Sequence, residues 1–204
     1  MIAVVSSLPA EGKTTVSVNL GISFAQCGES VLLIDADLRR STMHAQFGLP
    51  HSYDGITTIL TQGMNDRAIL TPLEALPNLK MLPAGPHPPN PAELLSSKRM
   101  LEVLEAFSAQ FDRIIIDTPP ILSVSDSLPL ANIADAVVLV VRSGVARKKA
   151  VLRARSLLER ANSNLVGIVF NCVNLQMEHY YHAYGAHYGK AMRNYYSSGD
   201  GETD

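Results

Sequence analysis

The chain has 204 residues, of which 47% are hydrophobic and 18% are charged. A domain of this size can bury a core without disulfides or a structural metal. The 17 basic and 19 acidic residues leave a formal net charge of −2, so the composition does not favour the broad basic surface that binds nucleic acid without regard to sequence. No apolar run approaches the roughly 20 residues that span a bilayer, and no signal peptide is expected.

Runs rich in β-branched residues are predicted to be strands. They are near-continuous rather than alternating, which is typical of strands covered on both faces. These runs are Ile2–Val5, Val31–Ile34, Leu79–Leu82, Ile114–Ile116, Ala136–Val141 and Leu165–Phe170. Between them lie stretches with helical spacing, at Thr14–Cys27, Lys98–Gln110, Ser123–Ala131 and Lys148–Ala161. Because strand and helix alternate, we predict an α/β fold with a doubly wound, mainly parallel sheet.

Two segments interrupt this alternation. Pro83–Pro91 carries five prolines and is predicted to be neither regular helix nor central strand. From Asn174 onward the chain loses aliphatic residues and gains Tyr, Gly and His. We therefore predict a domain over residues 1–173 and a mobile tail over residues 174–204.

The two cysteines, Cys27 and Cys172, are far apart, form no CxxC pattern and lie beside apolar residues. We expect both to be reduced thiols in the core. A reducing cytoplasm is therefore the expected compartment.

The strongest motif follows the first predicted strand and opens the first helix. Ser7–Thr14 reads Ser-Leu-Pro-Ala-Glu-Gly-Lys-Thr, the phosphate-binding loop pattern with Ser7 in place of the usual first glycine. The backbone N–H groups of such a loop and the N-terminus of the helix hold polyphosphate, and Gly12 lets the backbone approach it closely. Lys13 is expected to reach the β- and γ-phosphates of ATP, and the Thr14 hydroxyl to bind Mg²⁺. The predicted nucleotide contacts in this region are Pro9, Ala10, Glu11, Gly12, Lys13, Thr14 and Thr15.

Acidic residues follow two further predicted strands. Asp35 and Asp37 leave the end of one buried strand, and Asp117 ends the run Ile114–Ile116 before two prolines. Ligands of parallel sheets bind at the carboxyl ends of the strands, and Mg²⁺ prefers hard oxygen ligands and water. A single acid at a strand end is usually a cap or a solvated turn, but three beside a phosphate loop favour a nucleotide and metal site.

These motifs together resemble those of the bacterial tyrosine kinases, often called BY-kinases, and of the wider set of partitioning and septum-placing ATPases. The resemblance covers nearly the whole chain and implies a P-loop NTPase fold. Two features favour the kinases. The wider set usually carries an extra lysine where this chain has Leu8, and the segment Asn90–Ser97 is similar to a stretch typical of the kinases.

The tail adds a cluster of tyrosines. A helical core stripe is one reading of their spacing, but Gly185 and Gly189 weaken a helix there and aliphatic partners are few. The cluster resembles the autophosphorylation tail of BY-kinases, which implies that these side chains accept phosphate. They are Tyr180, Tyr181, Tyr184, Tyr188, Tyr195 and Tyr196.

The resemblance also implies roles for the site residues. Lys13 would clamp the transferring phosphate and Thr14 would hold Mg²⁺. Asp35 corresponds to the proposed acceptor of the tyrosine proton, while Asp37 and Asp117 would orient the metal and its waters. Phosphoryl transfer needs mainly positioning and charge neutralisation, which this set can supply.

Other residues keep open alternatives. Asn171 ends the last apolar strand, where related ATPases contact the base. Arg39 or Arg40 would stabilise phosphate charge or form a salt bridge elsewhere. The basic stretch Arg147–Arg160 is expected to be a solvated helical face, with docking of a neighbour's tail or of anionic lipid as the alternative. The tail histidines, which have no convincing ligand spacing, are given no role: His179, His182 and His187.

The function implied is an ATP-dependent tyrosine autokinase acting between copies, which regulates capsular polysaccharide or exopolysaccharide synthesis or export. The implied partners are other copies in a possible ring and a membrane activator, fused or separate, which would hold the chain at the inner face of the membrane. The motif begins within a few residues of Met1, so the sequence is expected to be either a minimal domain or a catalytic fragment of a longer protein. The alternative is a partitioning-type ATPase switch that positions a partner without phosphorylating protein.

Overall fold

The computed structural model describes residues 1–50, 54–63, 70–73 and 76–174. Within them, Met1–Cys172 form one compact unit. The tyrosine cluster and the tail histidines lie outside the described residues. The division into a domain over 1–173 and a mobile tail over 174–204 therefore stays a prediction.

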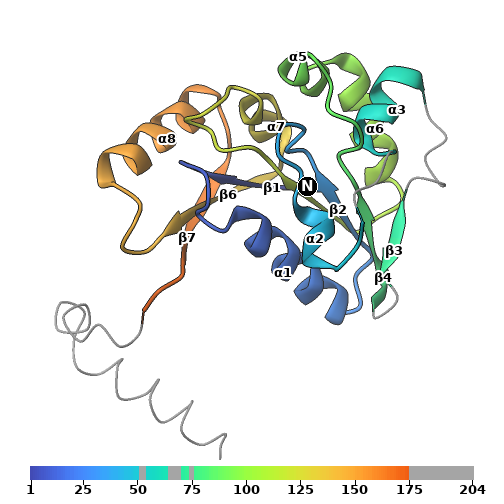
Figure 1. Ribbon diagram of the computed structural model, residues 1–204, viewed down its shortest axis with the longest axis horizontal. Helices are drawn as coiled ribbons and strands as arrows, with labels where there is room; N and C mark the ends of the chain where they lie inside the picture. Colours follow the sequence, from blue (N-terminus) through green and yellow to red (C-terminus); the bar gives the residue numbers. More distant parts are fainter. Residues whose placement is uncertain (51–53, 64–69, 74–75, 175–204) are drawn as a thin grey trace, which may run out of the picture. The chain divides into compact units, whose positions relative to one another are not determined.

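The described residues form a seven-stranded sheet in the order β3-β4-β2-β5-β1-β6-β7 (Figure 1). Every neighbouring pair is parallel except β3 with β4, which confirms the predicted mainly parallel sheet. All the predicted strands are present, and the short antiparallel β3 was not predicted. The strands are β1 Ile2–Ser6, β2 Val31–Asp35, β3 Thr71–Leu73, β4 Leu76–Leu82, β5 Arg113–Asp117, β6 Ala136–Arg142 and β7 Leu165–Asn171.

The four predicted helices are also present, as α1, α6, α7 and α8. Three short helices were not predicted, because each is too brief to show a helical period and α3 is rich in β-branched residues. The described helices are α1 Lys13–Gln26, α2 Met43–Gln46, α3 Ile56–Gln62, α5 Pro91–Leu95, α6 Lys98–Ser108, α7 Ser127–Ile133 and α8 Lys148–Arg160.

Helices cover both faces of the central strands, and β2 shows how. Leu32 and Ile34 are buried in a cluster that includes Phe107 of α6, whereas Val31 and Leu33 are buried in a cluster with α1. Successive side chains of a strand point to opposite faces, so a strand packed on both sides is apolar throughout. Each fully buried Leu or Ile side chain contributes about 1.5–3 kcal/mol to folding. This packing holds the carboxyl ends of β2 and β5 side by side.

The strand β7 departs from the expectation that every apolar run is covered on both faces. It pairs with β6 at the end of the described sheet, and Val166, Ile168 and Phe170 are 59%, 45% and 61% exposed. As the last strand of the described sheet, β7 has a neighbouring strand on one side only. The helix α8 also leaves most of the side chains of β7 exposed to solvent. The apolar run predicted the strand correctly but not its burial.

The expectation that both cysteines lie in the core was wrong. Both are free thiols, but both are exposed. Cys27 follows the last residue of α1 as its C-cap, where the chain turns at the surface. Cys172 follows the exposed strand β7. Apolar neighbours in the sequence therefore did not indicate burial at these two ends.

Two predicted boundaries also differ. The proline-rich segment was expected to contain no helix, yet Pro91 is the first residue of α5, a position where proline is tolerated because its missing N–H has no helical partner. The helix predicted from Ser123 begins at Ser127. The N–H groups of Ser123 and Val124 instead bond the carbonyl of Pro120, which forms a turn before α7.

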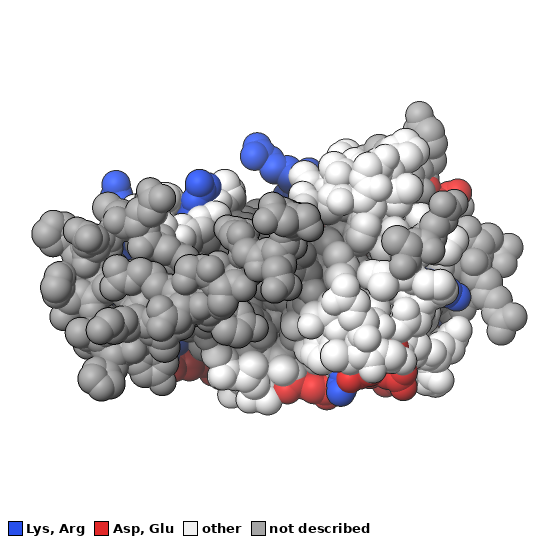
Figure 2. Space-filling model, turned by 90° about the horizontal axis from the view of Figure 1, so that it is seen from below, with Lys and Arg blue, Asp and Glu red and all other residues white. Residues whose placement is uncertain are grey.

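Among the residues that the structure describes, few charges lie on the α1 side of the molecule. After Lys13, no residue of α1 is charged. Figure 2, which views the molecule from below, shows a largely uncharged described surface with acidic and basic side chains towards its borders. The helix thus packs its apolar residues on the sheet and exposes mainly neutral polar ones.

Candidate nucleotide site

The phosphate loop connects β1 to α1, in the order that the sequence predicted. Its conformation depends on Gly12, which has φ 87°, in the region that favours glycine. A Cβ atom at this position would lie 1.8 Å from Nδ2 of Asn171. Gly12 is therefore required by both its backbone angle and its neighbour.

Side chains at the carboxyl ends of the strands hold the carbonyl groups of the loop. The hydroxyl of Ser6 donates to the carbonyl of Leu8 at 3.0 Å. Arg142 donates to the carbonyl of Ala10 at 3.1 Å, and Asn171 to that of Glu11 at 3.0 Å. The strands β1, β6 and β7 thus each contribute one bond that fixes the loop backbone.

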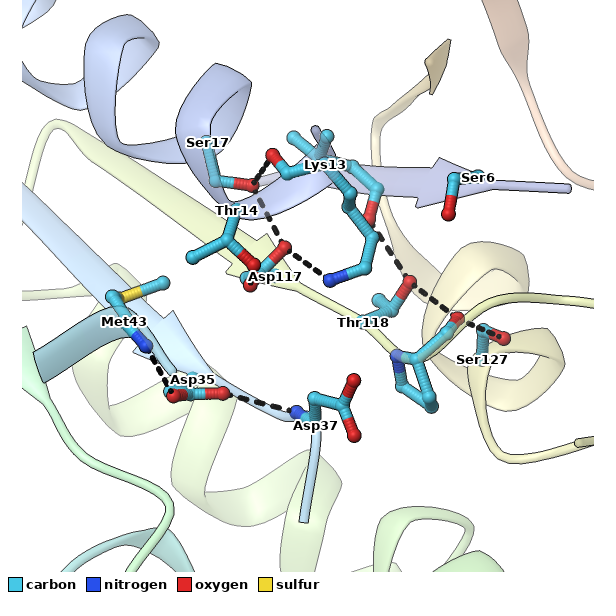
Figure 3. Close-up of polar contacts among 12 residues, drawn as sticks. Ser6, Lys13, Thr14, Ser17, Asp35, Asp37, Met43, Asp117, Thr118 and Ser127 are labelled. Carbon is cyan, nitrogen blue, oxygen red and sulfur yellow. Dashed lines mark hydrogen bonds and ion pairs between the residues drawn. The ribbon is translucent and has the colours of Figure 1, made fainter. Parts of the chain in front are cut away.

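Asp117 joins the first turn of α1 to the end of β5 (Figure 3). Its Oδ1 lies 2.7 Å from Nζ of Lys13, and its Oδ2 accepts a hydrogen bond from the Thr14 hydroxyl at 2.7 Å. The Ser17 hydroxyl lies 3.1 Å from Oδ1 of Asp117. The ion pair is buried, with side chains 8% and 1% exposed, so these bonds supply the partners that a buried carboxylate needs.

Asp35 lies next to Asp117, because the two residues are paired in the parallel register of β2 and β5. It accepts hydrogen bonds from the Ser41 hydroxyl at 2.8 Å and from the backbone N–H groups of Asp37 and Met43 at 3.2 Å each. Burial raises the pKa of Asp35 to about 7, and the negative charge of Asp117 adds to this effect. The hydrogen bonds and Lys13 act in the opposite direction. Asp35 can therefore exchange a proton near neutral pH.

Asp37 lies closer to the opening of the site and is 9% exposed. Its Oδ1 accepts a hydrogen bond from the backbone N–H of Arg40 at 3.0 Å, which closes a turn after β2. Figure 3 shows its carboxylate beside the end of β2, on the same side of the sheet as Lys13 and Asp117. The three predicted acids thus lie together at the carboxyl ends of β2 and β5.

Arg39 forms a salt bridge in this structure, one of its two predicted alternatives. Its Nε and Nη2 donate to the two carboxylate oxygens of Asp126 at 2.6 and 3.2 Å. The Asp126 side chain is 2% exposed and that of Arg39 is 44% exposed. This bidentate pair ties the segment after β2 to the start of α7. Asp126 was not among the predicted site residues, because the contact joins residues far apart in the chain.

A pocket of about 650 Å³ opens over these elements. Of the predicted site residues that the structure describes, Asp35, Asp117 and Asn171 do not line it. Each instead bonds residues that do: Asp35 accepts from the N–H of Asp37, Asp117 bonds Lys13 and Thr14, and Asn171 donates to the carbonyl of Glu11. The lining includes Pro9, Ala10, Glu11, Gly12, Lys13, Thr14, Thr15, Asp37, Arg39, Arg40, Thr42 and Gln46.

The oxygen donors suit a magnesium ion that is bound largely through phosphate and water. Among the described residues, no group of three or more His, Cys, Asp and Glu side chains is arranged to hold a metal ion. The Thr14 hydroxyl and the Asp117 carboxylate are hard donors in direct contact, and Asp37 is nearby. Mg²⁺ usually keeps several waters and few protein ligands at nucleotide sites, so this sparse donor set fits it.

Two residues of the site were not predicted although their spacing carried a signal. Ser17 stands four residues after Lys13 on α1, a spacing that places both on one helical face. Ser41 follows Asp35 within a few residues, and Ser side chains commonly bond nearby groups in such turns. Both bond the predicted carboxylates, so each helps to fix an acid in place.

A strand, a glycine-containing loop and a helix, with acids on the neighbouring strands, define a P-loop nucleotide-binding protein. The chain matches the family described as AAA domain over residues 1–152. It is 41% identical over 184 residues to the tyrosine-protein kinase YwqD of Bacillus subtilis (strain 168), covering 90% of this chain and 77% of that protein. The chain therefore belongs to the bacterial tyrosine-protein kinases and is a protein-tyrosine kinase.

Solved structures agree with this assignment. The kinase domain of VpsO is similar with a TM-score of 0.80 and 39% identity, over 85% of this chain and 84% of that chain. The chimerical protein CapA2B2 is similar with a TM-score of 0.80 and 32% identity, over 84% of this chain and 75% of that chain. The recognition of the family and its fold from sequence is thus confirmed.

Proposed function

We propose that this chain transfers the γ-phosphoryl group of ATP to tyrosines of its own C-terminal cluster, on neighbouring copies. The observation that carries the proposal is the buried network of Lys13, Thr14 and Asp117 beside Asp35, at the edge of a tyrosine-kinase fold. The proposed acceptors lie in the tail over residues 174–204, and the kinase domain spans residues 1–173. The tyrosine-rich sequence of the tail supports this division.

In this proposal the nucleotide phosphates lie along the loop from Pro9 to Thr15. Lys13 would contact the transferring phosphate in place of Asp117, and Thr14, Asp37 and Asp117 would hold Mg²⁺ and its waters. When bound, the ion neutralises charge on the phosphate oxygens. The side-chain amide of Asn171, which now bonds the loop, is proposed to contact the base.

Asp35 is the proposed acceptor of the tyrosine proton. An unperturbed tyrosine has a pKa of about 10, and a base is most effective when its own pKa is near the working pH. The pKa of about 7 that burial and Asp117 give Asp35 suits this role. The phenol O–H bond would break as its oxygen attacks the γ-phosphorus, with ADP as the leaving group.

The proposed biological role is regulation of capsular polysaccharide or exopolysaccharide synthesis or export, as the family resemblance implies. Other copies, in a possible ring, and a membrane activator, fused or separate, are the proposed partners. The chain would then act in the cytoplasm at the inner face of the membrane. No helix among the described residues is long and apolar enough to cross a bilayer.

Intact-mass measurement after incubation with ATP and Mg²⁺ tests the proposal. Additions of about 80 Da each, mapped to peptides spanning Tyr180–Tyr196 and absent in Lys13→Met, are the expected result. Lys98→Met is the matched control, because the Lys98 side chain is 90% exposed on α6. ADP formation without any mass addition would instead support the ATPase switch.

Transfer between copies has its own experiment. A truncated chain that ends at Asn174 would be mixed with the full-length Lys13→Met variant. The truncated chain supplies the active site, and the variant supplies the tyrosines. Phosphate on the Lys13→Met chain is expected. Activity of the full-length wild type alone, with none in the mixture, would show that transfer occurs within one copy.

A further inference from the structure

A carboxylate is buried within the phosphate loop itself. Glu11 is 3% exposed and Ser7 is fully buried. The Ser7 hydroxyl lies 3.0 and 2.9 Å from the two carboxylate oxygens of Glu11, and the backbone N–H of Leu8 donates to one of them at 2.8 Å. The first and last parts of the loop are thus joined through one side chain.

This arrangement accounts for the residue that departs from the usual loop pattern. Ser7 stands where a glycine is usual, and a glycine would offer no side-chain donor. A buried carboxylate without donors is costly, so Glu11 and Ser7 depend on each other. The backbone of Ser7 is also fixed from outside, because its carbonyl accepts a hydrogen bond from the N–H of Leu122 at 3.2 Å.

Phosphate would not be a favourable contact for this carboxylate, since both groups are negative. The side chain instead bonds donors of the loop itself. A loop that already has its binding shape loses less conformational entropy when the ligand arrives. The benefit of the Glu11 contacts therefore falls on nucleotide binding rather than on the chemical step.

We propose that Ser7 and Glu11 form a lock that holds the phosphate loop in its binding shape before the nucleotide enters. Glu11 is in this view a positioning residue, and its acceptor oxygens matter more than its charge. The lock rests on the proposed function only in taking an adenine nucleotide as the ligand.

Calorimetric titration of the full chain with MgADP tests the lock. Glu11→Ala is expected to weaken binding about tenfold, the effect of leaving buried donors without their acceptor. Glu11→Gln keeps an oxygen for the Leu8 N–H and can donate to the Ser7 hydroxyl, so its affinity is expected within about threefold of wild type. Glu105→Ala, at an exposed site on α6, is the control and should bind normally.

The coupling between the two residues gives a second measurement. Ser7→Ala is expected to weaken binding, but adding it to Glu11→Ala should cost little more, because both changes break the same contact. Additive losses would overturn the lock, and so would a Glu11→Gln chain that binds as weakly as Glu11→Ala. Normal binding by Glu11→Ala would also overturn it.

Thermal unfolding distinguishes a lock on the loop from a contact that only stabilises the fold. If Glu11→Ala fails to fold, Glu11→Gln and Ser7→Ala carry the test, with the melting temperature measured for each. A merely structural role would lower the melting temperature of Ser7→Ala without changing its dissociation constant for MgADP, and that result would overturn the proposal. Because the titration needs no phosphate transfer, it remains decisive even if the tyrosines are not phosphorylated.

Discussion

Asp35 and Asp117 stand opposite each other at the ends of β2 and β5, yet their partners differ. Asp117 is bonded to the ammonium group of Lys13 and to two hydroxyls. Asp35 has one hydroxyl and backbone N–H groups as donors, and among the described residues no cation bonds it directly. Burial disfavours the ionised form of Asp35, and the negative charge of Asp117 disfavours it further. Both effects raise the pKa of Asp35.

The first prediction concerns the pH dependence of activity. If ionised Asp35 accepts the tyrosine proton, the rate of phosphate transfer should rise with pH through about 7, the pKa of this group. Asp35→Asn should lower the rate by about two to four orders of magnitude and abolish the rise. Initial rates of tyrosine phosphorylation between about pH 6 and pH 8.5 would be compared. An equal rise in the variant would assign the titration to another group.

The second prediction concerns stability. The native pKa of Asp35 is raised from 3.8 to about 7, so between these values the folded chain holds a proton that the unfolded chain has released. The free energy of unfolding should therefore fall as the pH rises across this window. Asp35→Asn should flatten this dependence, as measured by thermal unfolding at about pH 5.5 and pH 7.5.

Asp112→Asn is the control for that measurement. Hydrogen bonds from Ser30 lower the pKa of Asp112. The ionised form of Asp112 therefore favours the folded chain, and this contribution is lost only in more acidic solution. Its variant should keep the wild-type slope between about pH 5.5 and pH 7.5. If Asp35→Asn kept that slope too, another buried group would be responsible.

The third prediction concerns Gly12. Alanine there meets both a φ of 87° and the amide nitrogen of Asn171 at 1.8 Å, so Gly12→Ala should abolish measurable MgADP binding. The backbone strain alone is worth about 1–2 kcal/mol. Adding Asn171→Ala removes the steric clash but not the backbone strain. The double variant should therefore recover part of the free energy of unfolding that Gly12→Ala loses.

Gly48→Ala is a matched control for Gly12→Ala. Gly48 also has a positive φ, of 64°, but a Cβ atom there would meet no described atom within 4 Å. It should lose stability through strain alone and bind MgADP normally. Full MgADP binding by Gly12→Ala would show that the loop can open away from Asn171.

The central strands and the positions of the three acids near the phosphate loop were predictable because their signals are local. A run such as Ile114–Ile116 is apolar enough to be buried on both faces, and Asp117 directly after it must lie at the sheet edge. The phosphate loop is likewise contained in one contiguous segment. Such features need no knowledge of the rest of the chain.

Other features depend on contacts between distant segments, which the sequence does not display. The partner of Arg39 is 87 residues away in Asp126, and the exposure of Phe170 depends on what packs beside β7. Helix α3 begins where Gly55 lies against the backbone of Pro83 and Gly85. These outcomes follow from tertiary packing, which overrides local propensity.

The last prediction concerns the salt bridge between Arg39 and Asp126. Arg39→Ala leaves a nearly fully buried carboxylate without its bidentate partner, and we expect a loss of about 1–2 kcal/mol, since the exposed part of Arg39 is screened by solvent. Arg39→Lys should recover little, because an ammonium group cannot make two parallel bonds to one carboxylate. Urea unfolding of these variants measures the loss.

A double-mutant cycle completes that test. Asp126→Asn removes the charge, so Arg39→Ala in that background should cost much less than in wild type. Arg40→Ala is the control for stability, because Arg40 is the exposed neighbour of Arg39.

The segment after β2 also carries Asp37, so breaking the pair should reduce phosphate transfer by more than the stability loss explains. Unchanged transfer at a temperature where every variant is folded would limit the salt bridge to a structural role.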